Sequence, residues 1–132
     1  MSLAPLLAAP AIVQIHVLAA LSALGLGALQ LAAPKGTLPH RTLGWLWVAL
    51  MAGVALSSFW ISGVAGPGRW SWIHVVSAFT LLALGAAVLH ARRGRVRAHR
   101  SAMLGLFLGA LVITGGFTLL PGRIMGAAIF GW

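Results

Sequence analysis

Four long apolar runs, separated by short segments rich in proline, glycine or charge, dominate the chain. Each run holds about twenty apolar residues, enough for an α-helix to cross roughly 30 Å of hydrocarbon. The pattern predicts an all-α integral membrane protein, with four antiparallel transmembrane helices in a bundle. We expect one domain over residues 1–132. Its spans should cover about residues 8–33, 42–63, 71–91 and 101–120, followed by a short interfacial C-terminal tail.

Two helix boundaries are set by proline and glycine. The first helix should begin near Pro5 or Pro10, since proline is tolerated in a first turn. The second helix should end within the glycine-rich residues 63–68. These positions bracket the apolar runs without requiring any long loop.

Composition narrows the class further, because hydrophobic residues make up 61% of the chain and charged residues only 7%. There is no cysteine, which excludes disulfides and thiolate metal sites. The chain has nine Lys and Arg residues but no Asp or Glu, so its cations need counter-charges from outside. Membrane lipid phosphate, an anionic cofactor or an acidic partner can supply them. Soluble nucleic-acid binding is excluded by hydropathy, and a carboxylate-driven transporter is disfavoured.

The cations also predict orientation, because Lys and Arg in short loops are retained on the cytoplasmic side. Only Arg69 and Arg123 fall at the ends of the spans that meet the N-terminal side of the membrane. The loops after the first and third spans carry the other seven, which are Lys35, Arg41, Arg92, Arg93, Arg95, Arg97 and Arg100. We therefore predict a multi-pass protein of a bacterial cytoplasmic (inner) membrane with both termini outside.

Small residues recur along one face of each span, and in membranes such faces let helices approach closely. At about 100° per residue, one stripe of the first helix contains His16, Ala20, Ala23, Gly27 and Gln30. Similar lines on the other helices comprise Ala49, Gly53 and Ser57; His74, Ala78, Leu81 and Gly85; and Gly105, Gly109 and Gly116. We predict that all four lines pack against neighbouring helices.

The five histidines are the main proton-exchanging and metal-binding groups, because side-chain carboxylates and thiols are absent. His16 and His74 lie at similar depth near the outer ends of the first and third helices. Two histidines at one level of a helix bundle can hold a b-type haem between their imidazoles. His16 and His74 are therefore the predicted metal ligands. The alternative for His16 is a hydrogen bond to a neighbouring helix.

The other three histidines, His40, His90 and His99, fall at the inner boundary beside the arginines. A pair of them could hold a second haem, whose propionates would meet Arg41. Against a second haem, His74 and His90 are sixteen residues apart, about 160° around a straight helix, so both cannot face one core. An interfacial role for the three histidines is the alternative.

Several short stretches form a pattern that covers nearly the whole chain: Lys35-Gly36-Thr37 with His40-Arg41-Thr42-Leu43-Gly44-Trp45; Ser57-Ser58-Phe59-Trp60-Ile61; Ile73-His74-Val75-Val76-Ser77-Ala78-Phe79-Thr80-Leu81; Arg97-Ala98-His99-Arg100 with Met103; and Leu120-Pro121-Gly122-Arg123-Ile124-Met125. In combination they resemble the bacterial DUF2306 family of small, uncharacterised membrane proteins. The resemblance implies a four-span inner-membrane protein. More loosely, histidines on antiparallel helices with a basic inner loop are similar to b-type cytochromes of the cytochrome b561 kind.

Two functions remain open at this point. The first is a haem-b electron-transfer protein with His16 and His74 as axial ligands, exchanging electrons with quinone. The second is a non-catalytic accessory or assembly subunit, which docks through its small-residue faces and arginines onto a larger membrane complex or another copy of itself. Membrane lipids are partners in both cases, and nucleic acid in neither.

Overall fold

The structure, a computed structural model, describes residues 1–61 and 69–132 and is helical throughout its regular elements. No strand occurs in these residues, so the all-α prediction is confirmed. Three long helices come first, α2 (Ala11–Ala32), α3 (Leu38–Ser58) and α4 (Trp72–Arg92). The fourth, Val96–Phe117, joins α5 (Val96–Gly105), the π-helical segment η1 (Leu106–Ile113) and α6 (Thr114–Phe117). Two short helices, α1 (Ala4–Leu7) and α7 (Ile124–Phe130), lie near the termini.

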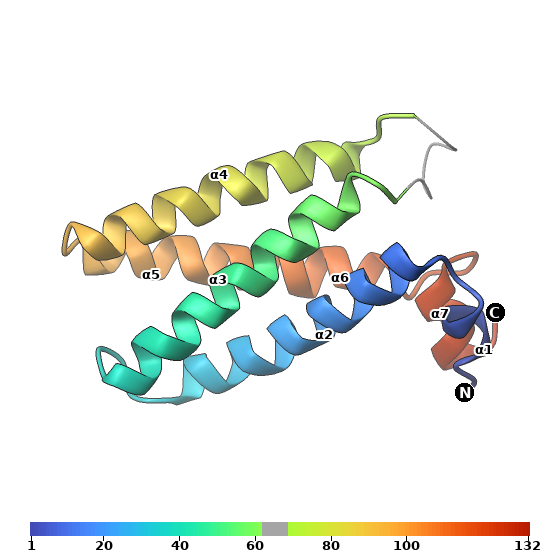
Figure 1. Cartoon of the computed structure of the whole chain (residues 1–132), viewed down its shortest axis with the longest axis horizontal. Helices are drawn as coiled ribbons and strands as arrows, with labels where there is room; N and C mark the ends of the chain where they lie inside the picture. Colours follow the sequence, from blue (N-terminus) through green and yellow to red (C-terminus); the bar gives the residue numbers. More distant parts are fainter. Residues whose placement is uncertain (62–68) are drawn as a thin grey trace.

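Long helices that follow one another in the chain run in opposite directions and pack together (Figure 1). α3 lies between α2 and α4, and α4 also packs against α5. The π-helical segment η1 contacts both α2 and α4, which closes the arrangement. α2 and α4 have no direct packing contact in the described part of the chain.

Both termini lie at the end of the molecule where α2 begins and Val96–Phe117 ends (Figure 1). There α1 packs against α7, and the Ser2 backbone N–H donates a hydrogen bond of 2.8 Å to the Ala128 carbonyl. The turns that join α2 to α3 and α4 to α5 lie at the opposite end (Figure 1). We call these the terminal end and the basic end, because the second carries Lys35, Arg41, Arg92, Arg93, Arg95, Arg97 and Arg100.

Three helices are long and apolar enough to cross a membrane: Ala11–Ala32, Trp72–Arg92 and Val96–Phe117. Large apolar side chains stand exposed along them, as lipid contact would require, and Leu18, Phe79 and Leu82 are examples. α3 has a similar length of 21 residues but is not among the three. It carries His40 and Arg41 in its first turns and Ser57 and Ser58 in its last, which lowers its hydropathy.

The helices begin and end where local chemistry stabilises their free backbone groups. α2 starts at Ala11 because Pro10 precedes it in an extended conformation. At its other end the Lys35 ammonium donates hydrogen bonds of 2.7–2.8 Å to the carbonyls of Gln30, Leu31 and Ala33. Thr37 caps α3, accepting a 3.3 Å hydrogen bond from the His40 N–H.

Some predicted boundaries differ from the observed ones. α3 begins at Leu38, before the predicted residue 42, because proline fits the first turn of a helix and Pro39 is in that turn. α3 ends at Ser58. Residues 63–68, where we predicted its end, lie outside the described residues, which omit 62–68. The last long helix begins at Val96 and ends at Phe117, earlier than predicted at both ends.

The core lies midway along the helices and is centred on Trp47 and Met51 of α3. The Trp47 indole N–H donates a 2.9 Å hydrogen bond to the Ala23 carbonyl of α2. Ala23 and Gly27 are buried, and a Cβ added to Gly27 would lie 2.7–2.8 Å from the rings of Phe107 and Trp47. The small-residue stripe predicted for the first helix is therefore a true packing face.

The predicted stripes on the other helices are largely wrong. Ala49, Gly53, Ala78 and Gly85 are exposed, and a Cβ added to Gly105, Gly109 or Gly116 would meet open space. Of these lines, Ser57 and His74 are buried as predicted. The other buried residues are Trp47, Met51, Ala55 and Ser58 on α3, and Ser77, Thr80, Leu84 and Ala87 on α4. In the last long helix the π-helical turns of η1 change the register, so a count at 100° per residue no longer finds the buried face.

The glycine contacts predict opposite outcomes for two matched substitutions. Gly27→Ala should destabilise the protein by about 1–3 kcal/mol, because the new methyl group would push the Trp47 ring away from its hydrogen bond to Ala23. Gly53→Ala adds the same methyl group on an exposed helix face and should leave stability unchanged or slightly raised. Thermal unfolding in detergent, followed by circular dichroism, measures both. Equal melting of the two variants would contradict this packing.

Candidate functional site

A cavity of about 660 Å³ occupies the terminal half of the molecule, between α2, α3, α4 and the η1–α6 part of the last long helix. Segments on either side of Pro121 and the start of α7 close its terminal end. The lining is mostly apolar and carries a few polar side chains. Cavities of this size and character are typical of sites for small organic molecules.

His16 of α2 lines this cavity, and its ring is held by α3. Its Nδ1 atom lies 2.7 Å from the Ser57 hydroxyl oxygen. The Ser57 hydroxyl also lies 3.0 Å from the Val54 carbonyl, which can accept its one proton. When Ser57 donates to Val54, Nδ1 supplies the proton of the His16–Ser57 hydrogen bond and Nε2 carries the lone pair; when Ser57 donates to Nδ1, the two ring nitrogens exchange these roles. In the first tautomer Nε2 can accept a hydrogen bond or bind a metal.

Three hydroxyl groups form a polar strip on the α3 and α4 side of the cavity. Ser58 donates to the Ala55 carbonyl at 2.6 Å, and Ser77 donates to the Ile73 carbonyl at 2.9 Å. The Ser58 and Ser77 hydroxyls also hydrogen bond to each other, so one of the two directs its proton to the other hydroxyl instead of to its carbonyl. This bond links the two helices. Thr80 donates to the Val76 carbonyl at 2.8 Å. All three protons are used within the protein, and only oxygen lone pairs remain.

His74 is buried at the start of α4 and has a local structural role. Its Nδ1 atom accepts a 3.1 Å hydrogen bond from the Ser71 backbone N–H, so the ring is part of the cap of the helix. The ring also packs against Trp70 and Phe59, with centroid distances of 5.2 and 5.8 Å. Because Nδ1 accepts, the neutral His74 ring carries its proton on Nε2.

The structure does not bring His16 and His74 into one site. His16 lines the cavity and is bonded to α3, whereas His74 is not among the lining residues and is bonded to its own helix cap. Axial ligation by both Nε2 atoms would require His74 to leave the cap and change its tautomer. Among the described residues there is no group of three or more His, Cys, Asp or Glu side chains able to hold a metal ion. The haem pair stays a prediction.

The three inner histidines lie at the basic end, as expected for an interfacial position. His99 of α5 contacts the Ala87 carbonyl of α4 through Nδ1 at 2.8 Å. The His40 carbonyl accepts a 2.8 Å hydrogen bond from the Gln30 side chain of α2. The Nδ1 atoms of His40 and His90 are buried without a protein partner. Burial lowers the pKa of His40, and the nearby Lys35 and His99 lower it further.

The arginines at the basic end are exposed, and one of them, Arg92, also contacts an aromatic ring. The Arg92 guanidinium lies over the Trp45 ring, 5.6 Å from its centroid, a cation–π arrangement at the end of the bundle. Arg41, the predicted propionate partner of a second haem, is exposed in the second turn of α3. The second-haem prediction, like the first, stays a prediction.

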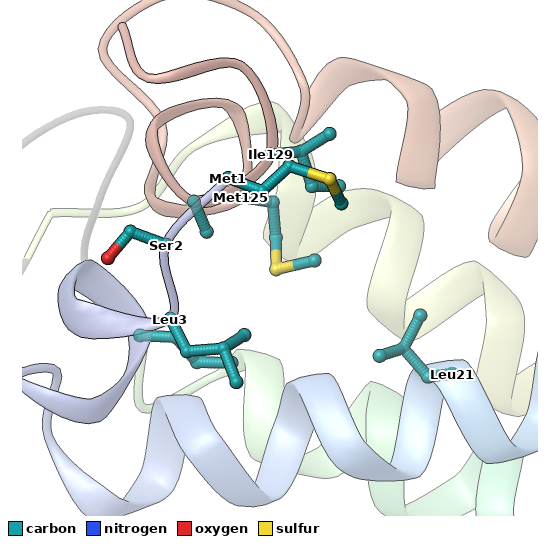
Figure 2. Close-up of a pocket in the computed structure, with 8 residues that line it drawn as sticks. Met1, Ser2, Leu3, Leu21, Met125 and Ile129 are labelled. Atoms are coloured by element: carbon teal, nitrogen blue, oxygen red, sulfur yellow. The ribbon is translucent and has the colours of Figure 1, made fainter.

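A smaller cavity of about 230 Å³ lies next to the first, where α1 and α7 meet α2 (Figure 2). Leu21, Met125 and Ile129 line both cavities, so the two adjoin. The smaller cavity is lined mainly by Met, Leu and Ile side chains, including Met1 and Leu3 of the N-terminal segment (Figure 2). It extends the apolar part of the site towards the terminal end.

Sequence reasoning singled out His16 but missed the hydroxyl strip of Ser58, Ser77 and Thr80. One signal was available: His74, Ser77 and Thr80 follow one another at intervals of three residues, which places them along one side of a helix. The link from Ser77 to Ser58 could not be found this way, because it depends on how α3 and α4 are aligned.

Comparison with known proteins identifies a family and no further relatives. A family model described as a predicted membrane protein (DUF2306) matches residues 13–127. No curated protein and no solved structure matches the chain. The family resemblance noted from the sequence motifs is therefore confirmed.

The lowered pKa of His40 predicts how stability depends on pH. Its neutral form is favoured in the folded protein, so its contribution to stability is present above the unfolded pKa of about 6.5 and is lost as pH falls towards the lower folded pKa. The melting temperature should fall between pH 7.5 and 5.5, and His40→Gln should reduce this fall. His90→Gln, which removes another histidine from the same end, is the control. Identical pH profiles for His40→Gln and the unmodified protein would refute the assignment.

Proposed function

The chain belongs to the DUF2306 family of predicted membrane proteins, and from this premise we propose that it is a multi-pass protein that binds a small lipophilic molecule in its larger cavity. In this proposal all four long helices span the bacterial cytoplasmic membrane as an antiparallel bundle. The observation that carries the binding function is the 660 Å³ cavity with the His16 imidazole on its wall. The next paragraphs give the support for each part.

The fourth span rests on the position and the polar ends of α3. It is as long as α4 and packs between α2 and α4, so a membrane that contains its neighbours also surrounds α3. Its polar residues lie at its two ends: His40 and Arg41 at one, and Ser57 and Ser58 at the other. Between them, Trp47, Met51 and Ala55 are buried in the bundle. This arrangement suits a span whose polar groups are covered by protein or lie near headgroups.

The orientation rests on the distribution of cations between the two ends. Seven Lys and Arg residues lie at the basic end and two, Arg69 and Arg123, lie near the terminal end. The excess supports an orientation with the basic end in the cytoplasm and both termini outside. The ligand cavity is then in the outer half of the membrane.

A binding function accounts for a cavity that structural reasons alone would not maintain. Membrane helices gain stability from close packing, so a volume of this size beside the core forfeits van der Waals contacts. The polar groups on its wall are not collapsed onto one another; they line the space from α2 on one side and from α3 and α4 on the other. A ligand with an apolar body and one polar group would restore the lost contacts.

Haem b is the second candidate, and one of the two tautomers of His16 favours it. In that tautomer the bare Nε2 of His16 could bind one axial side of a haem iron, with Nδ1 held by Ser57 as metal-bound imidazoles usually are. His74 does not fit the opposite side in this structure, since its Nε2 carries a proton. A haem would therefore be held by His16 alone or would require His74 to rearrange. The accessory-subunit hypothesis and a redox exchange with quinone stay predictions on which the described contacts do not bear.

The topology predicts opposite results for two families of fusions. Alkaline phosphatase, which is active only outside the cytoplasm, should be active when fused after Trp132 and inactive when inserted at Gly94 in the turn between α4 and α5. Green fluorescent protein should give the reverse pattern. A reporter inserted at Gly36, in the turn between α2 and α3, should behave like the one at Gly94, because two spans, α3 and α4, separate the two turns. Opposite results at Gly36 and Gly94 would overturn the fourth span, and a cytoplasmic C-terminal fusion together with outside reporters at both turns would overturn the orientation.

Ligand binding predicts that filling the cavity removes a bound molecule. We expect the protein purified in lipid nanodiscs to retain a small molecule, detected by mass spectrometry of an organic extract. Ala20→Phe, which fills the cavity from α2, should lose it at least about tenfold, the effect of about 1.4 kcal/mol. Ala28→Phe, on the exposed face of the same helix, should retain it.

The same samples test the haem candidate. A Soret band that sharpens on reduction and disappears in His16→Leu would identify haem as the retained molecule. Its persistence in His74→Leu would show that His16 alone provides a ligand. If extracts of all three proteins contain only the bulk lipids of the nanodisc, and no Soret band is present, the binding function is refuted.

A further inference from the structure

The hydrogen-bonding groups on the cavity wall identify the chemical class of the ligand. We propose that the cavity selects a lipophilic phenol or quinol, a molecule whose hydroxyl group donates a hydrogen bond to Nε2 of His16. The inference rests on the proposed binding function and adds the polar chemistry of the ligand. It follows from the hydrogen bonds of the cavity-lining hydroxyls of Ser58, Ser77, Thr80, Thr114 and Thr118; a further one, Ser71 at the terminal end, lies 3.2 Å from Nδ1 of His74.

Nε2 of His16 is an acceptor because of the contacts on the other side of the ring. In this proposal the Ser57 hydroxyl directs its proton to the Val54 carbonyl, 3.0 Å away, and Nδ1 of His16 donates to the Ser57 oxygen at 2.7 Å. Nε2 then carries the lone pair. His16 lines the cavity, so this lone pair is the acceptor that it offers to a ligand.

The hydroxyl groups on the wall give the ligand no proton. Those of Ser58, Ser77 and Thr80 are directed to carbonyls of their own helices or to each other. On the opposite wall, Thr114 donates to the Gly109 carbonyl at 2.9 Å and Thr118 to the Gly115 carbonyl at 2.6 Å. The oxygen atoms of these groups keep free lone pairs. These hydroxyl groups therefore offer acceptors to a ligand.

Among the described lining residues, the side chains of Trp72 and Arg123 also carry N–H donors. Trp72 is in the first turn of α4 and nearly half exposed, and Arg123 follows the Pro121-Gly122 turn. Both lie towards the terminal end, whereas His16 and the hydroxyl strip lie further along the helices. Within the described lining, a ligand whose polar group reaches this inner part meets hydroxyl oxygens and the His16 ring.

An acceptor-lined apolar cavity discriminates strongly between closely related molecules. A phenol or quinol can donate its hydroxyl proton to Nε2 of His16 and place its ring against the apolar walls. The corresponding quinone, or a methyl ether of the phenol, has only acceptor oxygens and would leave both its own oxygen and the imidazole lone pair without a partner. Sites that pair with a ligand hydroxyl reject analogues that lack it.

The test compares 4-octylphenol with its methyl ether, 4-octylanisole, which differ in the hydroxyl proton. Binding to the protein in nanodiscs is measured by isothermal titration calorimetry, and empty nanodiscs correct for partitioning into lipid. We expect the phenol to bind about tenfold more tightly than the ether. His16→Leu should remove this preference while both molecules still bind, and His90→Leu should keep it. Ala20→Phe should weaken both.

A second measurement needs no substitution and covers the case in which His16→Leu does not fold. In protein labelled with ¹⁵N-histidine, the nitrogen shifts of His16 should show a protonated Nδ1 and a bare Nε2. The Nε2 resonance should move when the phenol is added and stay when the ether is added. A protonated Nε2 on His16 overturns the inference whatever the binding data show.

The outcomes separate this inference from the proposed function. If phenol and ether bind equally tightly and Ala20→Phe weakens both, the cavity binds lipophilic molecules but the hydroxyl-donor class is wrong. If neither molecule binds beyond partitioning into the lipid, the proposed function and this inference fail together. If the ether binds more tightly than the phenol, the wall offers a donor and the proton assignment is wrong.

Discussion

Polar groups inside an apolar bundle have no water to bind, so each hydroxyl and each imidazole must find its partner within the protein. This constraint decides more about the present molecule than the hydrophobic pattern does. It brings buried hydroxyls to carbonyls of their own helices, joins Ser58 of α3 to Ser77 of α4, and gives both His16 and His74 a hydrogen-bond partner. The two histidines thereby differ: His16 is bonded to Ser57 of a neighbouring helix and lines a cavity, and His74 uses its lone pair to cap its own helix.

The same constraint explains why the two ends of the molecule differ. At the terminal end the polar groups are few, partnered and arranged around a space. At the basic end they are crowded, and several are buried without a partner: the side-chain carbonyl of Gln30 and Nδ1 of both His40 and His90. The Lys and Arg side chains at the same end are exposed, where headgroups and water can bind them. Most of the positive charge of the chain thus lies where water or headgroups can solvate it.

The sequence was sufficient for the features that depend on one helix at a time. The lengths of the apolar runs predicted the long helices, and the contrast between Pro10 and Lys35 at the two ends of α2 is visible in the residues themselves. The packing face of α2 was predicted because its small residues, such as Gly27, meet large rings from elsewhere. On α3 and α4 the same rule failed, since Trp47 and Leu84 supply the bulk that fills those spaces. The pairing of Ser57 with His16 depends on how two helices align, which no single helix encodes.

The π-helical segment η1 affects how the last long helix tolerates a change in its length. A π turn accommodates one residue more than the α-helical turn it replaces, and the Thr114 hydroxyl bonded to Gly109, five residues earlier, follows that wider spacing. Loss of one residue between Leu106 and Ile113 would restore α-helical turns and leave α5 and α6 in their present orientation, because the wide turns already absorb the extra residue. The wall of the cavity and the contact between His99 and Ala87 would both stay in place. One residue can thus be gained or lost at this point of the helix without turning the cavity wall away.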